Sequence, residues 1–298
     1  MKQIFDCVIV GSGIAGMTSA IYLKRANKNI LLIEKEVPGG LMNKTSSIEN
    51  YPGYTNIDGP SLVMNIYNQI NKLQIPILFD EVVDIQHDEK NQIILKKSEP
   101  IFTKNIIIST GRYPRKLNIE NEEQLIGHGI SYCALCDGSF FKGEDVCVIG
   151  GGNSALEESL YLSNICQKVT IINRGDKLRA DSILQDKIKE KNNVEILYNS
   201  KITSINGTTQ LESITVNQQT IPCKGLFVYI GLNPNIEFLK NLNLKEENGY
   251  IIVDHNMQTN IEGIYACGDV IKKDVYQIIT AASEGAIAAT SVQKRLNQ

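Results

Sequence analysis

Residues 7–23 read "CVIVGSGIAGMTSAIYL": an apolar run, a glycine-rich turn and then residues at helical spacing. Gly11, Gly13 and Gly16 form the pattern G-x-G-x-x-G between the predicted strand and the predicted helix. In a dinucleotide-binding βαβ unit these glycines let the backbone approach a pyrophosphate at the N-terminus of the helix. A second apolar run, "NILLIE" at residues 29–34, supplies the next strand.

The same pattern recurs in the middle of the chain. Gly150, Gly152 and Ala155 form G-x-G-x-x-A after the apolar run "VCVIG", and the strand "KVTIIN" follows the next predicted helix. Each unit continues with short alternating runs and ends in an apolar run, "NIIISTG" in the first and "GLFVYIG" in the second. The sequence therefore predicts an α/β fold with two Rossmann-like, three-layer domains.

The C-terminal part of the chain predicts how these domains are connected. The run "GIYACGDV" and the alanine-rich helical stretch after it have no counterpart in the second unit. We expect them to pack on the first, so that the second domain is inserted into it. This predicts a discontinuous first domain at residues 1–113 and 243–298, and a second domain at residues 114–242 that carries a CxxC pair, each with one nucleotide site.

The residue that ends the second strand of each unit predicts two different nucleotides. Glu34 ends this strand in the first unit, where a carboxylate accepts hydrogen bonds from an unphosphorylated ribose. The equivalent position in the second unit is Asn173, which is neutral and is followed by Arg174. An arginine attracts a 2′-phosphate that a carboxylate would repel, and Arg179 supplies a second cation. The first site is thus suited to FAD and the second to NADPH.

Composition and charge exclude several classes of partner. The chain has 298 residues, 42% of them hydrophobic and 21% charged, with a net charge of -3. This charge gives no reason to expect a nucleic acid or an acidic membrane surface as partner. No apolar run approaches the roughly 18 residues of a membrane span. The start, "MKQIFDCVIVGSG", is interrupted too early by Asp6 for a secretory signal, so we expect a cytoplasmic protein.

Among seven cysteines, only Cys133 and Cys136 form a close pair. The other five stand alone, and several lie in apolar runs where a free thiol behaves as a small buried hydrophobe: Cys7, Cys147, Cys166, Cys223 and Cys267. A structural zinc site needs four ligands, and the three histidines are scattered. The pair therefore indicates a redox centre and no metal site. Asp137 directly follows the pair. It is either a turn former in the dipeptide Asp137–Gly138 or a general acid–base group.

Specific motifs extend over the chain: "GSGIAG", "IENYPG", "CALCDG", "GGGNSALEE" and "CGDV". With them the sequence resembles the low-molecular-weight thioredoxin reductases essentially from end to end. Members of that family are FAD-containing homodimers that pass electrons from NADPH to thioredoxin or a similar small dithiol protein. The resemblance implies the same activity, cofactors and partner here.

The resemblance also implies roles for individual residues. Cys136 would face the flavin, Cys133 would attack the partner's disulfide, and Asp137 would transfer the proton. Asp269 would hold the ribityl or phosphate region of the flavin, and the helix from Gln277 would approach the isoalloxazine. The implied FAD positions are Gly11, Gly13, Ala15, Gly16, Glu34, Lys35, Gly39, Gly40, Leu41, Asn50, Val83, Thr110, Gly111, Gly268, Asp269, Val270, Gln277 and Ile278. The implied NADPH positions are Gly150, Gly152, Asn153, Ser154, Ala155, Arg174 and Arg179.

Four positions depart from the family pattern. Asn173 and Gly175 replace two members of the family's H-R-R-x-x-x-R motif, which narrows the preference for NADPH over NADH by about ten- to a hundredfold. Tyr276 replaces an arginine before the flavin-contacting glutamine, and Leu41 replaces a glutamine after the paired glycines.

Three alternatives remain at this point: a related reductase that uses ferredoxin, one that uses NADH and serves a peroxiredoxin-type protein, and a flavin redox sensor without turnover. Phe140 and Phe141, which follow the CxxC pair, are predicted to lie in the core and not to contact a partner.

Overall fold

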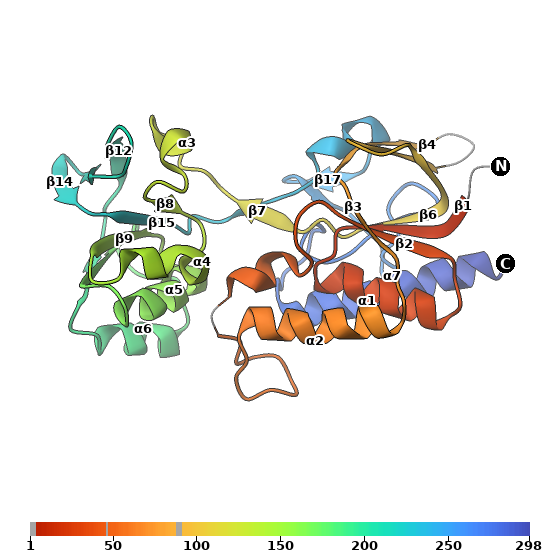
Figure 1. Ribbon diagram of the computed structural model, residues 1–298, viewed down its shortest axis with the longest axis horizontal. Helices are drawn as coiled ribbons and strands as arrows, with labels where there is room; N and C mark the ends of the chain where they lie inside the picture. The colour runs from red at the N-terminus through yellow and green to blue at the C-terminus, as the bar shows by residue number, and fades with distance from the viewer. Residues whose placement is uncertain (1–3, 46, 88–90) are drawn as a thin grey trace. The chain divides into compact units, whose positions relative to one another are not determined.

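The computed structural model describes residues 4–45, 47–87 and 91–298 (Figure 1). The chain divides into two compact units, Met1–Tyr113 with Asn233–Gln298, and Pro114–Leu232. The two connecting segments, β7 (Arg112–Pro114) and β16 (Leu232–Pro234), pair in a two-stranded sheet. Among the described helices, none is both long and apolar enough to cross a membrane.

The second boundary lies before Asn233 and not at residue 243, where the sequence placed it. The reason is the short helix η3 (Glu237–Leu242), whose Leu239 and Leu242 are buried in the core of the first unit. The apolar run that ends at Gly231 gave no sign that this segment packs there.

A seven-stranded sheet forms the centre of the first unit. Its parallel strands are β3 (Ile77–Phe79), β2 (Ile30–Glu34), β1 (Ile4–Val10), β6 (Ile101–Ile108) and β19 (Ile264–Ala266). Two antiparallel strands, β5 (Asn91–Leu95) and β4 (Val82–His87), extend it beyond the first half of β6. The pairing of β19 with the second half of β6 confirms that the C-terminal segment belongs to this unit.

Each face of this sheet buries its own core. Cys7 and Ile9 of β1 face one cluster with the helices, whereas Val8 and Val10 face the other with β4 and β5. The helices are α1 (Ile14–Arg25), α2 (Gly59–Lys72) and α7 (Ile278–Leu296), which Figure 1 shows along one side of the strands. Helices α1 and α7 cross closely, because a Cβ at Gly285 would lie 2.3 Å from the carbonyl oxygen of Ala15.

The second unit repeats this plan. Its five parallel strands are β11 (Val194–Leu197), β10 (Lys168–Ile172), β9 (Asp145–Ile149), β15 (Gly225–Val228) and β8 (Ile130–Ser131). The helices α5 (Asn153–Ser163) and α6 (Ser182–Lys189) share one core cluster with the sheet. A second cluster joins the sheet to the antiparallel strands β12 (Ile202–Asn206), β13 (Ser213–Val216) and β14 (Gln219–Pro222). The predicted pair of Rossmann-like, three-layer folds is confirmed.

An equivalent hydrogen bond forms inside each unit, at the turn after its first strand. The N–H of Gly11 donates to the carbonyl of Ile33 at 2.8 Å, and the N–H of Gly150 donates to the carbonyl of Ile172 at 3.1 Å. This bond joins each glycine turn to the end of the neighbouring parallel strand, which is where nucleotides bind in such sheets.

Candidate functional site

In the glycine turn of the first unit, two positions must be glycine because a side chain would collide with backbone atoms. The third glycine has open space beside it. Gly11 has φ +97°, and a Cβ there would lie 2.5 Å from the carbonyl oxygen of Ser109. A Cβ at Gly16 would lie 1.9 Å from the carbonyl oxygen of Gly11. At Gly13 a Cβ would have no atom of the described chain within 4 Å. The space beside Gly13 is therefore free for a ligand.

The N-terminus of α1 is suited to an anion in that space. Gly13 is the N-cap, no described side chain caps it, and the first turn holds no acidic residue. The first N–H groups of a helix have no partner within the helix, and they attract negative charge. The loop of Gly39 and Gly40 lies alongside, because the N–H of Gly39 donates to the carbonyl of Ser12 at 2.9 Å. These features fit a pyrophosphate.

Glu34 is fixed at the carboxyl end of β2, beside this turn. Its Oε2 accepts hydrogen bonds from the N–H and the hydroxyl of Ser12 at 2.9 and 2.6 Å, and its Oε1 accepts the N–H of Glu36 at 2.9 Å. Each carboxylate oxygen can accept a further hydrogen bond, as a ribose hydroxyl would require. The first unit therefore fits the FAD that the sequence predicted for it.

Among the predicted flavin positions, Asn50 and Gln277 are brought together from distant parts of the sequence. The side chain of Asn50 donates to that of Gln277 at 3.1 Å, at the N-cap of α7. The hydroxyl of Thr110 donates to the carbonyl of Asn235 at 2.7 Å. Val83 lies on β4 at an irregularity in its pairing with β5, where the paired residues pass from Val82 directly to Asp84. In the described pairing of these two strands Val83 therefore has no partner residue.

The remaining flavin positions have different surroundings. Ala15 and Val270 are buried packing residues, and Ala15 contacts α7 through Gly285. Lys35 is an exposed side chain with its ammonium 3.8 Å from Glu36. Leu41 lies in the short helix η1 (Gly40–Lys44), and Ile278 is the first residue of α7.

Asp269 is held from two sides by cations. Its Oδ2 lies 2.6 Å from Arg112, and its Oδ1 lies 3.3 Å from the ammonium of Lys273. Lys273 also donates to Glu284 at 2.8 and 3.0 Å, and Glu284 accepts the N–H of Gly268 at 2.9 Å. Burial raises the pKa of Glu284, which Lys273 opposes. This network fixes the "CGDV" segment against α7.

Tyr276, which stands where the resemblance implies an arginine, is in contact with the guanidinium of another arginine. The guanidinium carbon of Arg112 lies 4.2 Å from the centre of the Tyr276 ring, and the ring of Tyr250 lies 5.5 Å away. A guanidinium stacked on a tyrosine is attracted by about 0.5–2 kcal/mol. Arg112 therefore brings a cation to Tyr276 from a different segment, directly after Gly111.

The glycine turn of the second unit matches that of the first. Gly150 has φ +141°, and a Cβ there would lie 2.4 Å from the carbonyl oxygen of Tyr229. Gly152 is the N-cap of α5 and has no described atom within 4 Å of a Cβ position. Ala155 is buried and Ser154 is exposed on the same helix. The second turn therefore has the same open space at its middle glycine.

The loop after β10 determines which nucleotide this turn suits. The side chain of Asn173 donates to the carbonyls of Gly175 and Lys177 at 3.1 and 2.9 Å, so it holds the loop. The N–H of Arg179 donates to the carbonyl of Gly151 at 2.7 Å, which fastens the loop to the glycine turn. Arg174 and Arg179 are exposed, and neither has an ion pair within the described residues. Both cations are thus available to a 2′-phosphate.

Asn153 has a structural partner in this unit. Its side chain donates to the carboxylate of Asp181 at 2.8 Å and accepts the N–H of Asp181 at 2.9 Å. This pair joins the first turn of α5 to the N-cap of α6. The amide therefore positions two helices beside the nucleotide turn.

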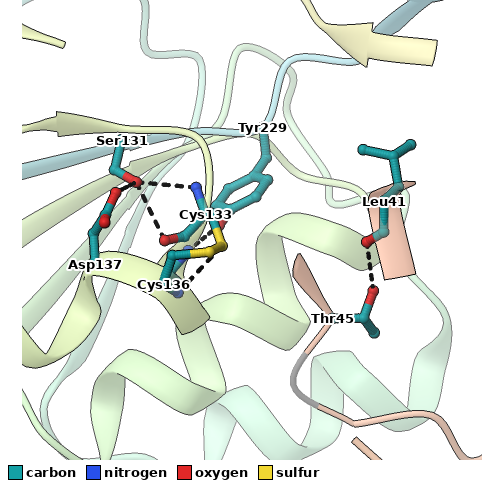
Figure 2. Close-up of a disulfide and its surroundings, with 8 residues drawn as sticks. Leu41, Thr45, Ser131, Cys133, Cys136, Asp137 and Tyr229 are labelled. Atoms are coloured by element: carbon teal, nitrogen blue, oxygen red, sulfur yellow. Dashed lines mark hydrogen bonds between the residues drawn. A yellow bond between two sulfur atoms is a disulfide. The ribbon is translucent and has the colours of Figure 1, made fainter. Parts of the chain in front are cut away.

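Cys133 and Cys136 form a disulfide, as predicted, with their Cα atoms 5.3 Å apart (Figure 2). Cys133 precedes the short helix α4 (Ala134–Asp137), and its Sγ accepts the N–H of Cys136 at 3.2 Å. A hydrogen bond of this kind favours a thiolate over a thiol once the disulfide is reduced. Cys133 is only 5% exposed, whereas Cys136 is an exposed residue.

Two hydrogen-bonding side chains surround the pair. Figure 2 shows the Ser131 hydroxyl between the carboxylate of Asp137 and the backbone of Cys133. The phenol oxygen of Tyr229 accepts the N–H of Ala134 at 2.9 Å. Burial raises the pKa of Tyr229 above its usual range, so its hydroxyl keeps its proton.

The other cysteines and the phenylalanines test two further predictions. The five single cysteines are free and buried, as predicted for small apolar side chains. Phe141 packs edge-on against Phe227, with ring centres 5.5 Å apart, and confirms its core assignment. The prediction was wrong for Phe140, which is 79% exposed. The two residues share the 3-10 turn η2 (Gly138–Phe141), where consecutive side chains point about 120° apart.

Sequence reasoning missed four residues of these sites. Ser12 lies inside the glycine motif, Ser131 lies two residues before Cys133, and Arg112 follows Gly111, so proximity to a motif could have indicated them. Tyr229 is different. It is distant from the CxxC pair in the sequence, and the alignment of β15 with β9 places it there.

Comparisons with known proteins agree with this geometry. The family model described as pyridine nucleotide-disulphide oxidoreductase matches residues 5–285. A thioredoxin reductase of Bacillus subtilis (strain 168) is 39% identical over 98% of this chain and 95% of its own length. A thioredoxin reductase of Mycoplasma genitalium is 40% identical, with 98% and 95% covered. A crystal structure of Lactococcus lactis thioredoxin reductase is 43% identical, covers 97% of this chain and 98% of its own, and has a TM-score of 0.93.

Proposed function

Because the chain belongs to the pyridine nucleotide-disulphide oxidoreductase family, and within it to the thioredoxin reductases, we propose that it reduces oxidised thioredoxin with electrons from NADPH. One observation carries the proposal most directly. A CxxC disulfide and a nucleotide turn with two free arginines belong to one unit, and the other unit has a turn suited to FAD.

FAD and NADPH are the cofactors. Gly13, Glu34 and the N-terminus of α1 would hold the pyrophosphate and ribose of FAD, while Asp269 would hold its ribityl or phosphate region. Gly152, Arg174 and Arg179 would hold NADPH. When bound, FAD passes an electron pair from the nicotinamide to a disulfide. The predicted domain roles follow, with FAD in the unit of Met1–Tyr113 and Asn233–Gln298 and NADPH in the other.

The exposures of the two cysteines support a reversal of their expected roles. The resemblance assigned attack on the partner's disulfide to Cys133, but this residue is 5% exposed. A thiolate must reach the partner's sulfur to attack it, and Cys136 is the exposed member of the pair. We therefore assign the attack to Cys136. Cys133, whose sulfur accepts the N–H of Cys136, then resolves the mixed disulfide.

Asp137 supplies the proton chemistry in this proposal. It directly follows Cys136, and its carboxylate accepts the Ser131 hydroxyl at 2.6 Å. Protonating the leaving sulfur when a disulfide opens, and removing a proton when it closes, is within the range of a carboxyl group beside the pair. The backbone position of Asp137 in α4 fixes it there.

A trapping experiment tests the assignment of the cysteines. Cys133→Ser and Cys136→Ser variants are mixed with a thioredoxin whose mixed disulfide cannot be resolved, and covalent complexes are separated on non-reducing gels. We expect Cys133→Ser to form the complex and Cys136→Ser to form none. Both variants should still bleach the flavin with NADPH, because bleaching precedes the disulfide step. A complex formed by Cys136→Ser alone would return the attack to Cys133.

Steady-state turnover tests the function itself. The purified protein should consume many equivalents of NADPH with oxidised thioredoxin, whereas a redox sensor should stop after about one equivalent. Anaerobic titrations with NADPH, NADH and reduced ferredoxin in parallel identify the donor. Flavin bleaching by ferredoxin alone would contradict the proposal.

We also propose that the protein is a cytoplasmic homodimer. Five buried free cysteines suit a reducing compartment, where single thiols stay reduced. The dimer is proposed from the resemblance to the family, and sedimentation of the flavin-loaded protein tests it. A single species at the 33.1 kDa of one chain would contradict it.

A further inference from the structure

Ser131 lies beside the redox pair, and the proposed function gives it no role of its own. It is the last residue of β8, is 4% exposed, and precedes Cys133 by two residues. Its Oγ lies within hydrogen-bond distance of three groups: 2.6 Å from Asp137 Oδ2, 3.0 Å from the Cys133 nitrogen and 3.2 Å from the Cys133 carbonyl oxygen. Figure 2 shows these three contacts converging on one oxygen.

The hydrogen count at this oxygen allows two arrangements. A serine hydroxyl has one proton to donate and two lone pairs that accept. The N–H of Cys133 can only donate, so it occupies one lone pair in both arrangements. The hydroxyl proton can then point either to the carboxylate of Asp137 or to the carbonyl of Cys133.

The two arrangements match the two protonation states of Asp137. When Asp137 is ionised, the hydroxyl donates to Oδ2, and 2.6 Å is typical of a charge-assisted O–H···O⁻ bond. When Asp137 is protonated, its own O–H donates to the second lone pair of Ser131, and the serine proton turns to the carbonyl of Cys133. Asp137 Oδ2, Ser131 and the N–H of Cys133 keep a partner in both states, with only the rotation of one hydroxyl.

We propose that Ser131 is a positioning residue that holds the Asp137 carboxyl beside the CxxC pair in both of its protonation states. The proposal rests on the proposed disulfide reductase function and on Asp137 as its proton donor and acceptor.

The protons balance as follows. Two electrons from the reductase activity break the Cys133–Cys136 bond, and one proton from the Asp137 carboxyl gives one thiol and one thiolate. When the pair passes two electrons to the partner's disulfide and closes again, the thiol proton returns to the Asp137 carboxylate. The two sulfurs released on the partner leave as thiolates and take their protons from solvent.

Other titratable groups near Asp137 must be separated from this effect. His128, Glu144 and Lys224 line the same cavity of about 420 Å³ as Asp137 and Ser131. Tyr229 and Glu158 interact with each other, and Tyr229 also interacts with Asp137. Tyr229 keeps its proton near neutral pH, because burial raises its pKa. A His128→Gln variant measures separately the contribution of the histidine that lines the same cavity.

The test measures the pH dependence of thioredoxin reduction in a double-mutant cycle. Ser131→Ala removes the hydroxyl, Asp137→Asn removes the titrating group, and the double variant combines them. Ser131→Thr keeps a hydroxyl, and Ser139→Ala makes the same chemical change at an exposed serine for which no contact is described. Flavin content and thermal unfolding are recorded for every variant.

We expect Ser131→Ala to lower kcat about tenfold, a part of the hundredfold or more that a placed acid–base group contributes. It should also shift the pH profile of kcat and leave KM for thioredoxin unchanged. In the Asp137→Asn background the same change should cost less than twofold, because no titrating carboxyl remains to be held. Ser131→Thr should restore the rate and the profile, and Ser139→Ala should match the parent protein.

A purely structural serine would behave differently. Equal losses of kcat in both backgrounds, an unshifted pH profile, or a Ser131→Thr variant as impaired as Ser131→Ala would each overturn the proposal. Failure of the proposed function and failure of the Ser131 proposal can be told apart. If the function is wrong, the parent protein itself will not reduce thioredoxin, and this shows before any variant is compared.

Discussion

The middle glycines of the two nucleotide turns permit a crossed experiment on cofactor assignment. Gly13 has φ −66° and ψ −178°, and Gly152 has φ −98° and ψ −179°, so alanine can adopt either conformation. A Cβ at either position meets no described atom within 4 Å. We therefore expect Gly13→Ala and Gly152→Ala to fold, with an N-cap cost of up to about 1 kcal/mol, or about 2–4 °C in Tm.

The ligands should respond very differently from the fold. The added methyl group enters the space where the helix N-terminus meets a phosphate, and losing one charge-assisted hydrogen bond costs about 1.5–3 kcal/mol. This raises Kd by about 10- to 150-fold. Gly13→Ala should lose affinity for FAD, and Gly152→Ala should lose affinity for NADPH while it keeps its flavin. Gly11→Ala, with a Cβ 2.5 Å from a backbone oxygen, should fail to fold at the same turn and is the contrasting control.

The assay combines three measurements. Bound flavin is measured by absorbance after gel filtration, FAD affinity by fluorescence of the reconstituted apoprotein, and NADPH affinity by flavin bleaching under anaerobic conditions. The reasoning is refuted if Gly13→Ala binds FAD as tightly as the parent protein. It is equally refuted if Gly152→Ala loses its flavin but keeps its affinity for NADPH.

Two further predictions concern charge. Arg174→Ala and Arg179→Ala should each raise Kd for NADPH about ten- to a hundredfold and leave Kd for NADH unchanged, as measured by flavin bleaching; equal losses with both nucleotides would exclude a role in 2′-phosphate recognition. Asp58, the N-cap of α2, accepts the N–H and hydroxyl of Ser61 at 2.8 and 2.7 Å, and the Ser61 side chain lowers its pKa. Because the folded pKa lies below the unfolded value, the stabilisation is present above about pH 4 and is lost as pH falls through the folded pKa. Asp58→Ala should therefore lower the free energy of unfolding by about 1 kcal/mol at pH 7, and thermal unfolding should show this difference shrinking towards pH 3. Asp58→Asn still caps the helix and should cost less. A loss of stability in Asp58→Ala that does not depend on pH would argue against the cap.

Local sequence patterns were sufficient for the parts of the site that a single βαβ unit builds. The spacing of Gly11, Gly13 and Gly16 requires a tight turn, because a side chain at the first or third glycine would collide with backbone. Glu34 and the neutral Asn173 stand at equivalent positions, at the end of the second strand of each unit. Both positions could be found by counting along the chain from the glycine motif. The close spacing of Cys133 and Cys136 is likewise enough to indicate a disulfide.

Other features depend on packing between distant segments. The boundary before Asn233 is determined by Leu239 and Leu242, which bury against the first sheet, and no local pattern marks them. The stacking of Arg112 on Tyr276 joins the end of one unit's sheet to the segment before α7. The exposure of Phe140 and the burial of Cys133 are properties of neighbouring elements, and residue type alone gave the wrong expectation for Phe140.

The sequence by itself determined the two nucleotide folds and the redox pair, and it predicted a different ligand for each turn, since backbone sterics and charge act over a few residues around each motif. Only the tertiary structure decided which cysteine is accessible and which groups surround Asp137. The physical reason is that solvent exposure and hydrogen-bond geometry depend on the side chains that other strands and helices bring to a site, and Tyr229 of the second sheet reaches the CxxC turn in this way.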